Sequence, residues 1–427
     1  MSQTRLSTRD LVPIWVNYFF LFASFAVVVP YLQLFFAAQG FPPSQIGVLV
    51  GTFEIAGILG PLFIGHLADR TGSFRLVIVL CGIVALGAFN LLNEFPLWAT
   101  ALPLAFVSGF SYKSIIPLQD AQASSLMIAP ELDYGRVRIL GSVGFIVSSA
   151  FFQTTGLLTG RAPGATPEAA PIITAISVLL LMFLAVTYLM PARPPRHVRE
   201  HHESRDADRG DQTGSARLAA DHSGGSLAAA GSAEGRSFAG FDTAFWLFVA
   251  VVFIARIGIA AYYSFFSLYL EREVGPGLVS GMWAIGAAAE VPVILFSGRL
   301  IRRFGILPLL VTGFVAVVVR LLIYAFLPLA PVIAVTQLLH AATFGLLHST
   351  AIAYINRRVP QRRRGLGMAI YSSVSLGLSI FIGSSIGGFV IEAFGFRGLF
   401  AGYAVMPALA IVVLVSRAHR LKLADNS

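Results

Sequence analysis

The chain has 427 residues, of which 56% are hydrophobic and 12% are charged, and its mean hydropathy is +0.78. A soluble domain of this size does not have such a composition, whereas a membrane protein with many spans does. The formal net charge of +9 would suit a nucleic-acid-binding protein, but the basic residues lie in short loops between apolar segments, which is the positive-inside pattern. Composition and charge therefore exclude a soluble domain and argue against a nucleic-acid partner.

The apolar segments are long and unbroken instead of alternating over about ten residues, so they predict helices rather than barrel strands. The first run, from Leu11 to Ala38, is too long for a cleavable signal peptide and lacks a small-residue cleavage site. The single cysteine, Cys81, lies in an apolar helix, so we expect neither a disulfide framework nor a cysteine-based metal site.

Twelve stretches have the length and apolar character of a membrane span. In chain order they are residues 11–38, 45–67, 75–93, 97–128, 136–158, 171–190, 242–270, 277–298, 306–328, 330–355, 365–391 and 396–416. An even number of spans places both termini on one side of the membrane.

The basic residues between these spans are distributed unequally. One side carries only Arg161, Arg272 and Arg397. The other side carries Arg5, Arg9, Arg70, Arg75, Arg136, Arg138, the seven arginines of the central loop, Arg299, Arg302, Arg303, Arg357, Arg358, Arg362, Arg363, Arg364, Arg417, Arg420 and Lys422. By the positive-inside rule, we expect an integral protein of the bacterial inner membrane with both termini in the cytoplasm.

Residues 191–240 interrupt the pattern, because they are rich in Gly, Ser, Ala, Arg, Asp and His and have no apolar periodicity. We expect a flexible cytoplasmic linker between a six-helix bundle at 1–190 and a second one at 241–427. The linker contains His197, His201 and His202, which could suggest a metal site. A solvated linker explains them better, since no other ligand there has a defined geometry, and no metal site is expected.

Equivalent helices in the two halves of the sequence are followed by similar turns. The second span is followed by Gly65-His-Leu-Ala-Asp69-Arg70-Thr-Gly72, and the eighth by Gly298-Arg299-Leu-Ile-Arg302-Arg303-Phe-Gly305. Positive-inside loops explain the arginines but not the repeated glycine spacing, which indicates the internal duplication found in transporters. Within the first turn, Asp69 beside Arg70 is available for a gating or structural ion pair at a helix end.

The G-x-L-A-D-R-x-G turn, the twelve spans and the long central loop together resemble the major facilitator superfamily over essentially the whole chain. Shorter motifs resemble its phenylpropionate-permease-like branch, which is related to the lactose permease and the nucleoside–proton symporters. These motifs are Pro117-Leu-Gln-Asp120-Ala, Asp133-Tyr134-Gly135-Arg136-Val-Arg138, Ala260-Ala-Tyr262-Tyr263, Trp283-Ala-Ile-Gly286-(x)3-Glu290 and Gln337-Leu-Leu-His340-(x)2-Thr343-Phe344-(x)3-His348. The resemblance implies an all-α membrane fold of two pseudo-symmetric six-helix bundles.

The chain departs from this branch at charged positions. Ile259 stands where the branch commonly has a histidine before A-A-Y-Y, and no arginine lies near Gly57 in the second span. Charges appear at Glu54, Lys113 and Arg256 instead. Moving charges around a cavity changes what it binds, so the resemblance implies the fold and the coupling more directly than it implies the substrate.

Six ionisable residues from six different spans fall near mid-membrane at 1.5 Å rise per residue. They are Glu54, Lys113, Arg256, Glu290, Arg320 and His340, with Asp120 and His348 one to two turns nearer the cytoplasm. Each such group costs roughly 2.5 kcal/mol or more in a bilayer, so it persists only for a reason. One could be a structural ion pair, but six from both halves indicate a shared aqueous cavity.

The neighbouring spans that contain Glu290 and Arg320 predict an ion pair. Arginine stays charged at any working pH, so Glu290 would be the partner that gains and loses the coupling proton; the alternative is a permanent structural salt bridge. His340 would relay protons with Glu290 or serve as a hydrogen-bonded packing residue, whereas packing is favoured for His348. The two histidines lie about 12 Å apart along one helix face, too far to share a zinc ion.

For the substrate, Lys113 and Arg256 could each hold a carboxylate, or one of them could neutralise Glu54. The aromatic residues Tyr262, Tyr263 and Trp283 would form a pocket wall that suits a phenyl group or a sugar face. Asp120 could tie its helix to the Arg136 and Arg138 region in a structural or gating role.

We therefore expect a proton-coupled symporter for a small organic solute, foremost an aromatic or other organic carboxylate, working by alternating access. A sugar or nucleoside symporter and a proton-driven exporter of drug-like compounds are the alternatives. No nucleophile–base constellation or phosphate-binding loop indicates an enzyme or an ATP-driven pump. We expect no cofactor beyond the coupling proton, no partner beyond solute and lipid, and function as a monomer.

Overall fold

The computed structural model describes residues 8–126, 130–159, 168–190 and 240–421, without the side chains of residues 8–11 and 125–138. The described residues are almost entirely helical. The predicted linker at 191–240 lies outside them apart from its last residue, so the domain boundaries stay a prediction.

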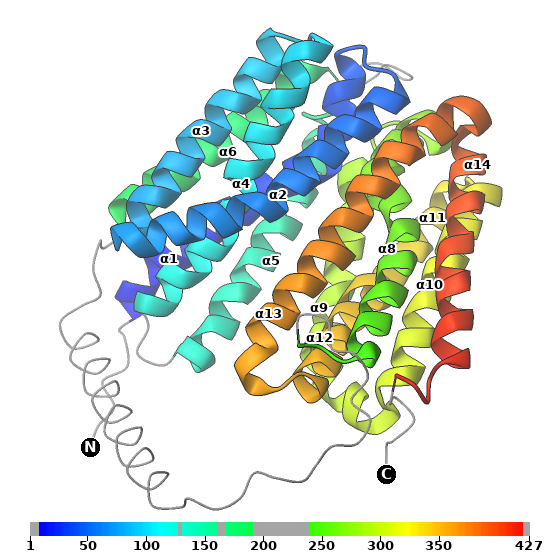
Figure 1. Ribbon diagram of the computed structural model, residues 1–427. Helices are drawn as coiled ribbons and strands as arrows, with labels where there is room; N and C mark the ends of the chain where they lie inside the picture. The colour runs from blue at the N-terminus through cyan, green and yellow to red at the C-terminus, as the bar shows by residue number, and fades with distance from the viewer. Residues whose placement is uncertain (1–7, 127–129, 160–167, 191–239, 422–427) are drawn as a thin grey trace, which may run out of the picture.

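Six helices form the first bundle. They are α1 (Thr8–Ala38), α2 (Pro43–Thr71), α3 (Phe74–Glu94), α4 (Trp98–Leu126), α5 (Pro130–Thr155) and α6 (Ala169–Leu189). Within it, α1 packs against α5 and α6, and α4 packs against α2 and α3. Figure 1 shows this bundle in blue to green beside the second bundle in green to red.

The second bundle begins with three helices, α8 (Thr243–Tyr269, continued by the π-helix η1, Leu270–Val274), α9 (Val279–Phe304) and α10 (Ile306–Phe326). The next span changes its helix type along its length, through α11 (Ala330–Thr336), the 3₁₀-helix η2 (Gln337–Leu339), the π-helix η3 (Ala341–Leu346) and α12 (Leu347–Arg358). The last segment comprises η4 (Gln361–Arg363), α13 (Arg364–Ile370), the π-helix η5 (Tyr371–Leu378) and α14 (Ser379–Ser416).

The twelve predicted spans all correspond to helices in the described residues. Ten segments are long and apolar enough to cross a membrane, and the described apolar part of α5, Ile139–Thr155, is shorter. The longest segment, Gln361–Ser416, contains two spans, because α14 breaks at Gly395 with a left-handed φ of 68° that favours glycine. The all-α fold with two bundles is therefore confirmed.

The repeated glycine turns are helix C-caps. Gly72 ends α2 with φ 63° and donates its N–H to the carbonyl of Ala68, while Gly305 ends α9 with φ 77° and donates to Ile301. Positive φ strains any residue with a Cβ, which explains the shared glycine spacing. Asp69 and Arg70 are exposed in the last turn of α2 and make no ion pair among the described residues, so their gating role stays a prediction.

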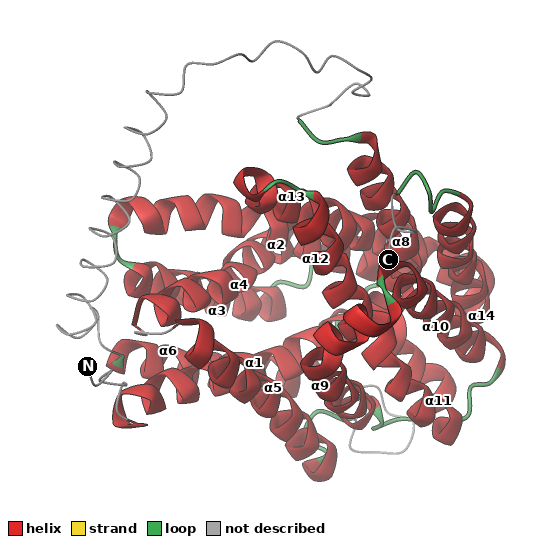
Figure 2. Cartoon of the chain, turned by 90° about the horizontal axis from the view of Figure 1, so that it is seen from below, coloured by secondary structure: helices red, strands yellow, loops and turns green. Residues whose placement is uncertain are grey.

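The two bundles are joined at the face opposite the termini. The start of α2 packs closely on α14, where a Cβ at Gly388 would lie 2.1 Å from the Pro43 carbonyl oxygen. The described hydrogen bonds between the bundles all lie in this half; they are Tyr31–Ser280, Gln33–Tyr263, Ser44–Glu392, Gln153–Gly277 and Gly281–Gln153. Figure 2 shows the two bundles from the face of the termini. These contacts hold the two bundles together at the face opposite the termini, so the structure is closed there.

Gln153 makes the most complete of these contacts. Its amide donates to the Gly277 carbonyl at 2.8 Å and its oxygen accepts the Gly281 N–H at 2.6 Å. We predict that Gln153→Ala weakens closure by about 2 kcal/mol, at about 1 kcal/mol per bond. The fraction of molecules open at this face should then rise by up to about 30-fold.

The measurement is maleimide labelling of Ser44→Cys at this face, in a Cys81→Ser background. Gln153→Glu is a second test, because it keeps the acceptor for Gly281 but sets a carboxylate oxygen against the Gly277 carbonyl. Because two oxygens repel each other there, it should also label faster than the parent. Equal labelling of all three proteins would show that Gln153 does not hold the face closed.

Candidate functional site

The most completely bonded charge in the membrane region is the Arg320 guanidinium on α10, which is 3% exposed. It donates to Gln337 Oε1 at 2.5 Å, to the Tyr324 hydroxyl at 2.6 Å, and to His340 Nδ1 and Thr343 Oγ1 at 3.2 Å each. Its Cζ lies 3.9 Å from the centre of the Tyr262 ring, in a cation–π contact. Five N–H donors with this many acceptors make a buried arginine tolerable.

The 3₁₀ turn in the tenth span explains why two of these acceptors, Gln337 and His340, face Arg320 together. Gln337, His340 and Thr343 are spaced three residues apart. An α-helix would rotate each of them away from the one before, whereas a 3₁₀ turn at Gln337–Leu339 brings residues three apart into register. The π-helix η3 follows directly, and such segments are frequent at functional sites.

The predicted direct pair of Glu290 with Arg320 is corrected by the structure, which places His340 between them. His340 Nε2 lies 3.7 Å from Glu290 Oε2, and its other ring nitrogen accepts from Arg320. The tenth span packs against both α9 and α10, so it separates two helices that are consecutive in sequence. The interaction is therefore a chain of three groups rather than a pair.

The bond from Arg320 determines the tautomer of His340. A guanidinium can only donate, so Nδ1 of a neutral His340 must accept and Nε2 must carry the hydrogen. That hydrogen is directed at Glu290, across a gap too long for a direct hydrogen bond. The Glu290 side chain is 18% exposed and the His340 side chain 9%. The carboxylate is therefore the more accessible end of the Arg320–His340–Glu290 series.

The predicted aromatic residues lie around the Arg320–His340–Glu290 series. The Tyr262 ring centre lies 5.1 Å from that of Trp283 and 5.6 Å from that of His340, and Tyr263 lies 6.4 Å from His340. Trp283 is held by a hydrogen bond from its indole N–H to Ser267 Oγ at 3.0 Å. A cavity of about 10 Å³ among these side chains and Arg320 has room for about one water molecule.

His348 continues the site as part of a ring stack on one helix face, as the spacing predicts. The ring centres of His340 and Phe344 lie 5.9 Å apart, those of Phe344 and His348 5.6 Å, and those of His348 and Tyr371 6.1 Å. The Tyr371 hydroxyl also contacts His348 Nδ1 at 3.4 Å. Phe344 separates the two histidines, and the described part of the chain holds no metal-binding cluster.

Lys113 and Glu54 form an ion pair between α4 and α2. Of the two sequence interpretations of Lys113, this geometry corresponds to the one in which it neutralises Glu54. Gly57 makes the pair possible, because a Cβ there would lie 2.2 Å from Lys113 Cδ. The pair borders a cavity of about 350 Å³ between the bundles, which Ser372 and Ser373 of η5 also line.

Asp120 binds a neighbouring helix of its own bundle. The Tyr18 hydroxyl of α1 donates to Asp120 Oδ1 at 2.5 Å, so the carboxylate joins α4 to α1. Its predicted partners Arg136 and Arg138 lie on α5 among residues whose side chains are outside the described part, so that link stays a prediction.

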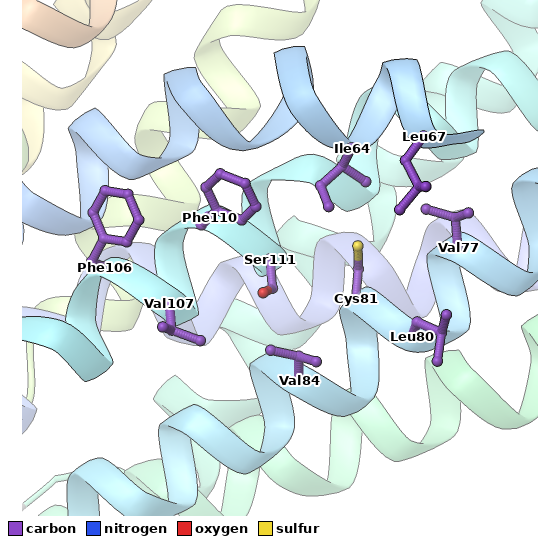
Figure 3. A pocket seen from close by; sticks show the side chains of 10 residues that line it. All are labelled: Ile64, Leu67, Val77, Leu80, Cys81, Val84, Phe106, Val107, Phe110 and Ser111. Carbon is purple, nitrogen blue, oxygen red and sulfur yellow. The ribbon is translucent and has the colours of Figure 1, made fainter. Parts of the chain in front are cut away.

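A second sizeable hollow lies on the outer surface of the first bundle. It has about 310 Å³ between α2, α3 and α4, and its lining is apolar apart from Cys81 and Ser111 (Figure 3). Leu67, Leu80 and Val84 in its wall are exposed. An apolar groove of this kind on a membrane protein suits lipid chains rather than a polar solute.

Sequence reasoning found most of this site but missed three side chains. Gln337 and Thr343 stand within a motif that resembles the phenylpropionate-permease-like branch, which was a usable signal. Tyr324 lies one helical turn after Arg320 on the same face, which was a usable signal. All three are partners of Arg320.

Comparison with models of protein families shows which family this protein belongs to. The model of the MFS_1 like family matches residues 11–401. The chain belongs to this family of the major facilitator superfamily. As a member, it is a membrane-embedded secondary transporter of a small-molecule solute and not an enzyme, in agreement with the sequence analysis.

Similar proteins of this superfamily cover nearly the whole chain. A "Probable 3-phenylpropionic acid transporter" of Escherichia coli (strain K12) is 29% identical over 429 residues, covering 98% of this chain and 99% of that protein. Maltose permease of Geobacillus stearothermophilus is 23% identical over 419 residues, covering 96% and 95%.

Among solved structures, that of nucleoside transporter NupG matches with a TM-score of 0.70 at 15% identity, covering 95% of this chain and 98% of the other. The inward open conformation of the xylose transporter XylE from Escherichia coli matches with a TM-score of 0.64 at 14% identity, covering 98% and 96%. At these identities, the two structures show the fold alone.

The Glu54–Lys113 pair in this major facilitator protein can be tested by a double-mutant cycle. Glu54→Gln or Lys113→Gln alone leaves a charge without its partner inside the membrane region. Each single substitution should therefore lower the free energy of unfolding by about 1–3 kcal/mol, while the double substitution should cost less than the sum. The measurement is thermal unfolding in detergent.

Asp69→Asn is the control, because Asp69 is exposed at the end of the same helix as Glu54. It should leave the unfolding temperature nearly unchanged. Additive losses in the Glu54→Gln/Lys113→Gln double variant would contradict a stabilising ion pair.

Proposed function

We propose that the protein is a proton-coupled symporter that takes up a small organic carboxylate by alternating access of its two bundles. The observation that carries this proposal is the Arg320–His340–Glu290 chain in the middle of the second bundle. It combines a permanent cation with two groups that can each hold a proton. It also lies beside an aromatic wall that could contact the solute.

The Arg320–His340–Glu290 series supplies a physical route for coupling proton binding to helix movement. When Glu290 is ionised, its charge is attracted to the Arg320 guanidinium through the His340 ring, which draws α9 toward the tenth span. When Glu290 takes up a proton, this attraction is lost, and the two helices are freer to move apart. Proton binding and helix movement are then linked through the same carboxylate, which is what symport requires.

Glu290, the more exposed end of the Arg320–His340–Glu290 series, suits proton entry. Glu290 is more exposed than His340, whose Nε2 hydrogen is directed at it. A proton would therefore arrive at the carboxylate first and pass to His340 only when the 3.7 Å gap between them shortens. Arg320 opposes a second positive charge on the ring, so Glu290 is the main proton carrier in this proposal.

Two features support a carboxylate with an apolar body as the solute. The walls at Tyr262, Tyr263, Trp283 and Phe344 offer aromatic faces, and the buried arginines offer positive charge. The similar protein of Escherichia coli is named for 3-phenylpropionic acid. Sugars and nucleosides also suit aromatic walls, but they do not use the positive charge. Dependence of transport on the solute carboxylate separates these alternatives.

We also propose that both termini lie in the cytoplasm of a bacterial inner membrane, because the basic residues gather on their side. The face shut by Gln153 and Ser44 is then the external one. In this assignment the structure is closed to the outside, and the 350 Å³ cavity beside Glu54 lies in the half nearer the cytoplasm.

The proposal predicts that Glu290→Gln separates transport from proton coupling. In proteoliposomes with an inward proton gradient, the wild type should accumulate 3-phenylpropionate and move protons with it. Glu290→Gln should lose this proton movement by at least about tenfold, the scale of losing one acid–base group. It should retain exchange of internal for external solute, because exchange needs no net proton transfer.

Glu94→Gln is the control, because Glu94 is an exposed carboxylate at the end of α3 and far along the chain from the site. It should accumulate solute like the wild type. Full gradient-driven accumulation in Glu290→Gln would refute the role of Glu290, and lack of proton movement in the wild type would refute symport.

A further inference from the structure

A second buried guanidinium, Arg256 of α8, differs from Arg320 in its hydrogen bonding. It is 2% exposed, yet its Nε and Nη2 atoms have no hydrogen-bond partner among the described residues. Its Cζ lies 5.7 Å from the centre of the Phe344 ring, and the Tyr371 hydroxyl is one of the neutral polar groups near it. A neutral ring and a hydroxyl do not balance a buried permanent charge.

No described carboxylate forms a salt bridge with Arg256. Lys113 and Glu54 cancel each other in the first bundle. In the membrane region of the second bundle, Glu290 lies beside His340 rather than in a salt bridge with Arg256. In the first bundle, Asp120 accepts a hydrogen bond from Tyr18. Three acidic residues at helix ends are occupied elsewhere, and a fourth, Glu273, is exposed. Asp242 pairs with Arg358, Glu271 accepts from Gly277, and Glu392 accepts from Ser44.

The surroundings of Arg256 are suited to a flat ligand. The rings of Phe344, His348 and Tyr371 form one continuous stack beside it, and Phe344 and His348 are only half-buried. These residues belong to η3, α12 and η5, so two of the three elements contain π-helical turns. Such turns depart from regular helix packing, and movement of the half-buried Phe344 ring would uncover the guanidinium.

We propose that Arg256 is the anchor for the carboxylate of the transported solute, and that the solute is a monocarboxylate with a planar aromatic group. A carboxylate would neutralise a buried charge that has no salt bridge among the described residues, and a guanidinium binds a carboxylate with two parallel hydrogen bonds. The free Nε and Nη2 donors supply these bonds, and the aromatic group stacks with Phe344 and His348. This inference rests on the proposed function and names the solute class and its anchoring residue.

The test compares 3-phenylpropionate with its uncharged amide, 3-phenylpropionamide, as ligands that raise the unfolding temperature of the purified protein. No proton gradient is present, so the result does not depend on coupling. The wild type should bind the acid at least tenfold more tightly than the amide. Arg256→Gln should bind both with similar affinity, and Arg256→Lys should keep a reduced preference for the acid.

Arg397→Gln is the matched control, because Arg397 also lies over a phenylalanine ring, with 4.8 Å from its Cζ to the centre of Phe326, but it is exposed at a helix end. It should keep the wild-type preference. The acid-to-amide ratio is measured within each variant, so a lower yield of folded Arg256→Gln does not alter it.

Two results would overturn the inference. One is an Arg256→Gln protein that still prefers the acid as strongly as the wild type, and the other is a wild type that binds neither compound or binds both equally. Failure of proton coupling gives a different pattern. A wild type that binds the acid tightly but moves no protons would refute symport and leave the role of Arg256 intact.

Discussion

The site depends on the cost of keeping the Arg320 guanidinium inside a membrane protein. That charge cannot be titrated away, so the fold must supply acceptors for its donors. Gln337, His340, Thr343 and Tyr324 do so, and three of them come from one span. The tenth span departs from α-helical geometry at Gln337–Leu339, and this 3₁₀ turn brings Gln337 and His340 to the face that meets Arg320.

The same constraint places a histidine between the two members of an expected ion pair. Because Arg320 occupies Nδ1 of His340, the opposite nitrogen carries the hydrogen toward Glu290. The histidine thus transmits the field of a fixed cation to a carboxylate that can change its charge. Arg256 stands outside this network with donors unused. In the proposed function the two arginines have separate tasks, since Arg320 holds the coupling groups and Arg256 binds the anion.

The two bundles divide the remaining work. In the first bundle, Lys113 and Glu54 neutralise each other, so its polar groups add no net charge to the adjacent cavity. Contacts between the bundles gather at the face opposite the termini, through Gln153, Ser44 and Tyr31. Apart from the carboxylate of Glu392, which accepts from the Ser44 N–H, these are neutral hydrogen bonds and glycine contacts. None is an ion pair between described residues, which suits a face that must open and close many times. The buried arginines lie deep in the molecule, whereas the contacts between the bundles lie at the face opposite the termini.

The sequence alone determined the membrane class, the twelve spans, the distribution of basic loops and the set of intramembrane ionisable residues, because hydropathy and charge are local properties. It also marked the C-cap glycines Gly72 and Gly305 through their spacing. Only the tertiary structure decided which charges meet. His340 separates Glu290 from Arg320, and Lys113 rather than Arg256 pairs with Glu54, because helix order along the chain does not give helix neighbours in space. The 3₁₀ and π turns that align these side chains arise from tertiary packing, which no local pattern encodes.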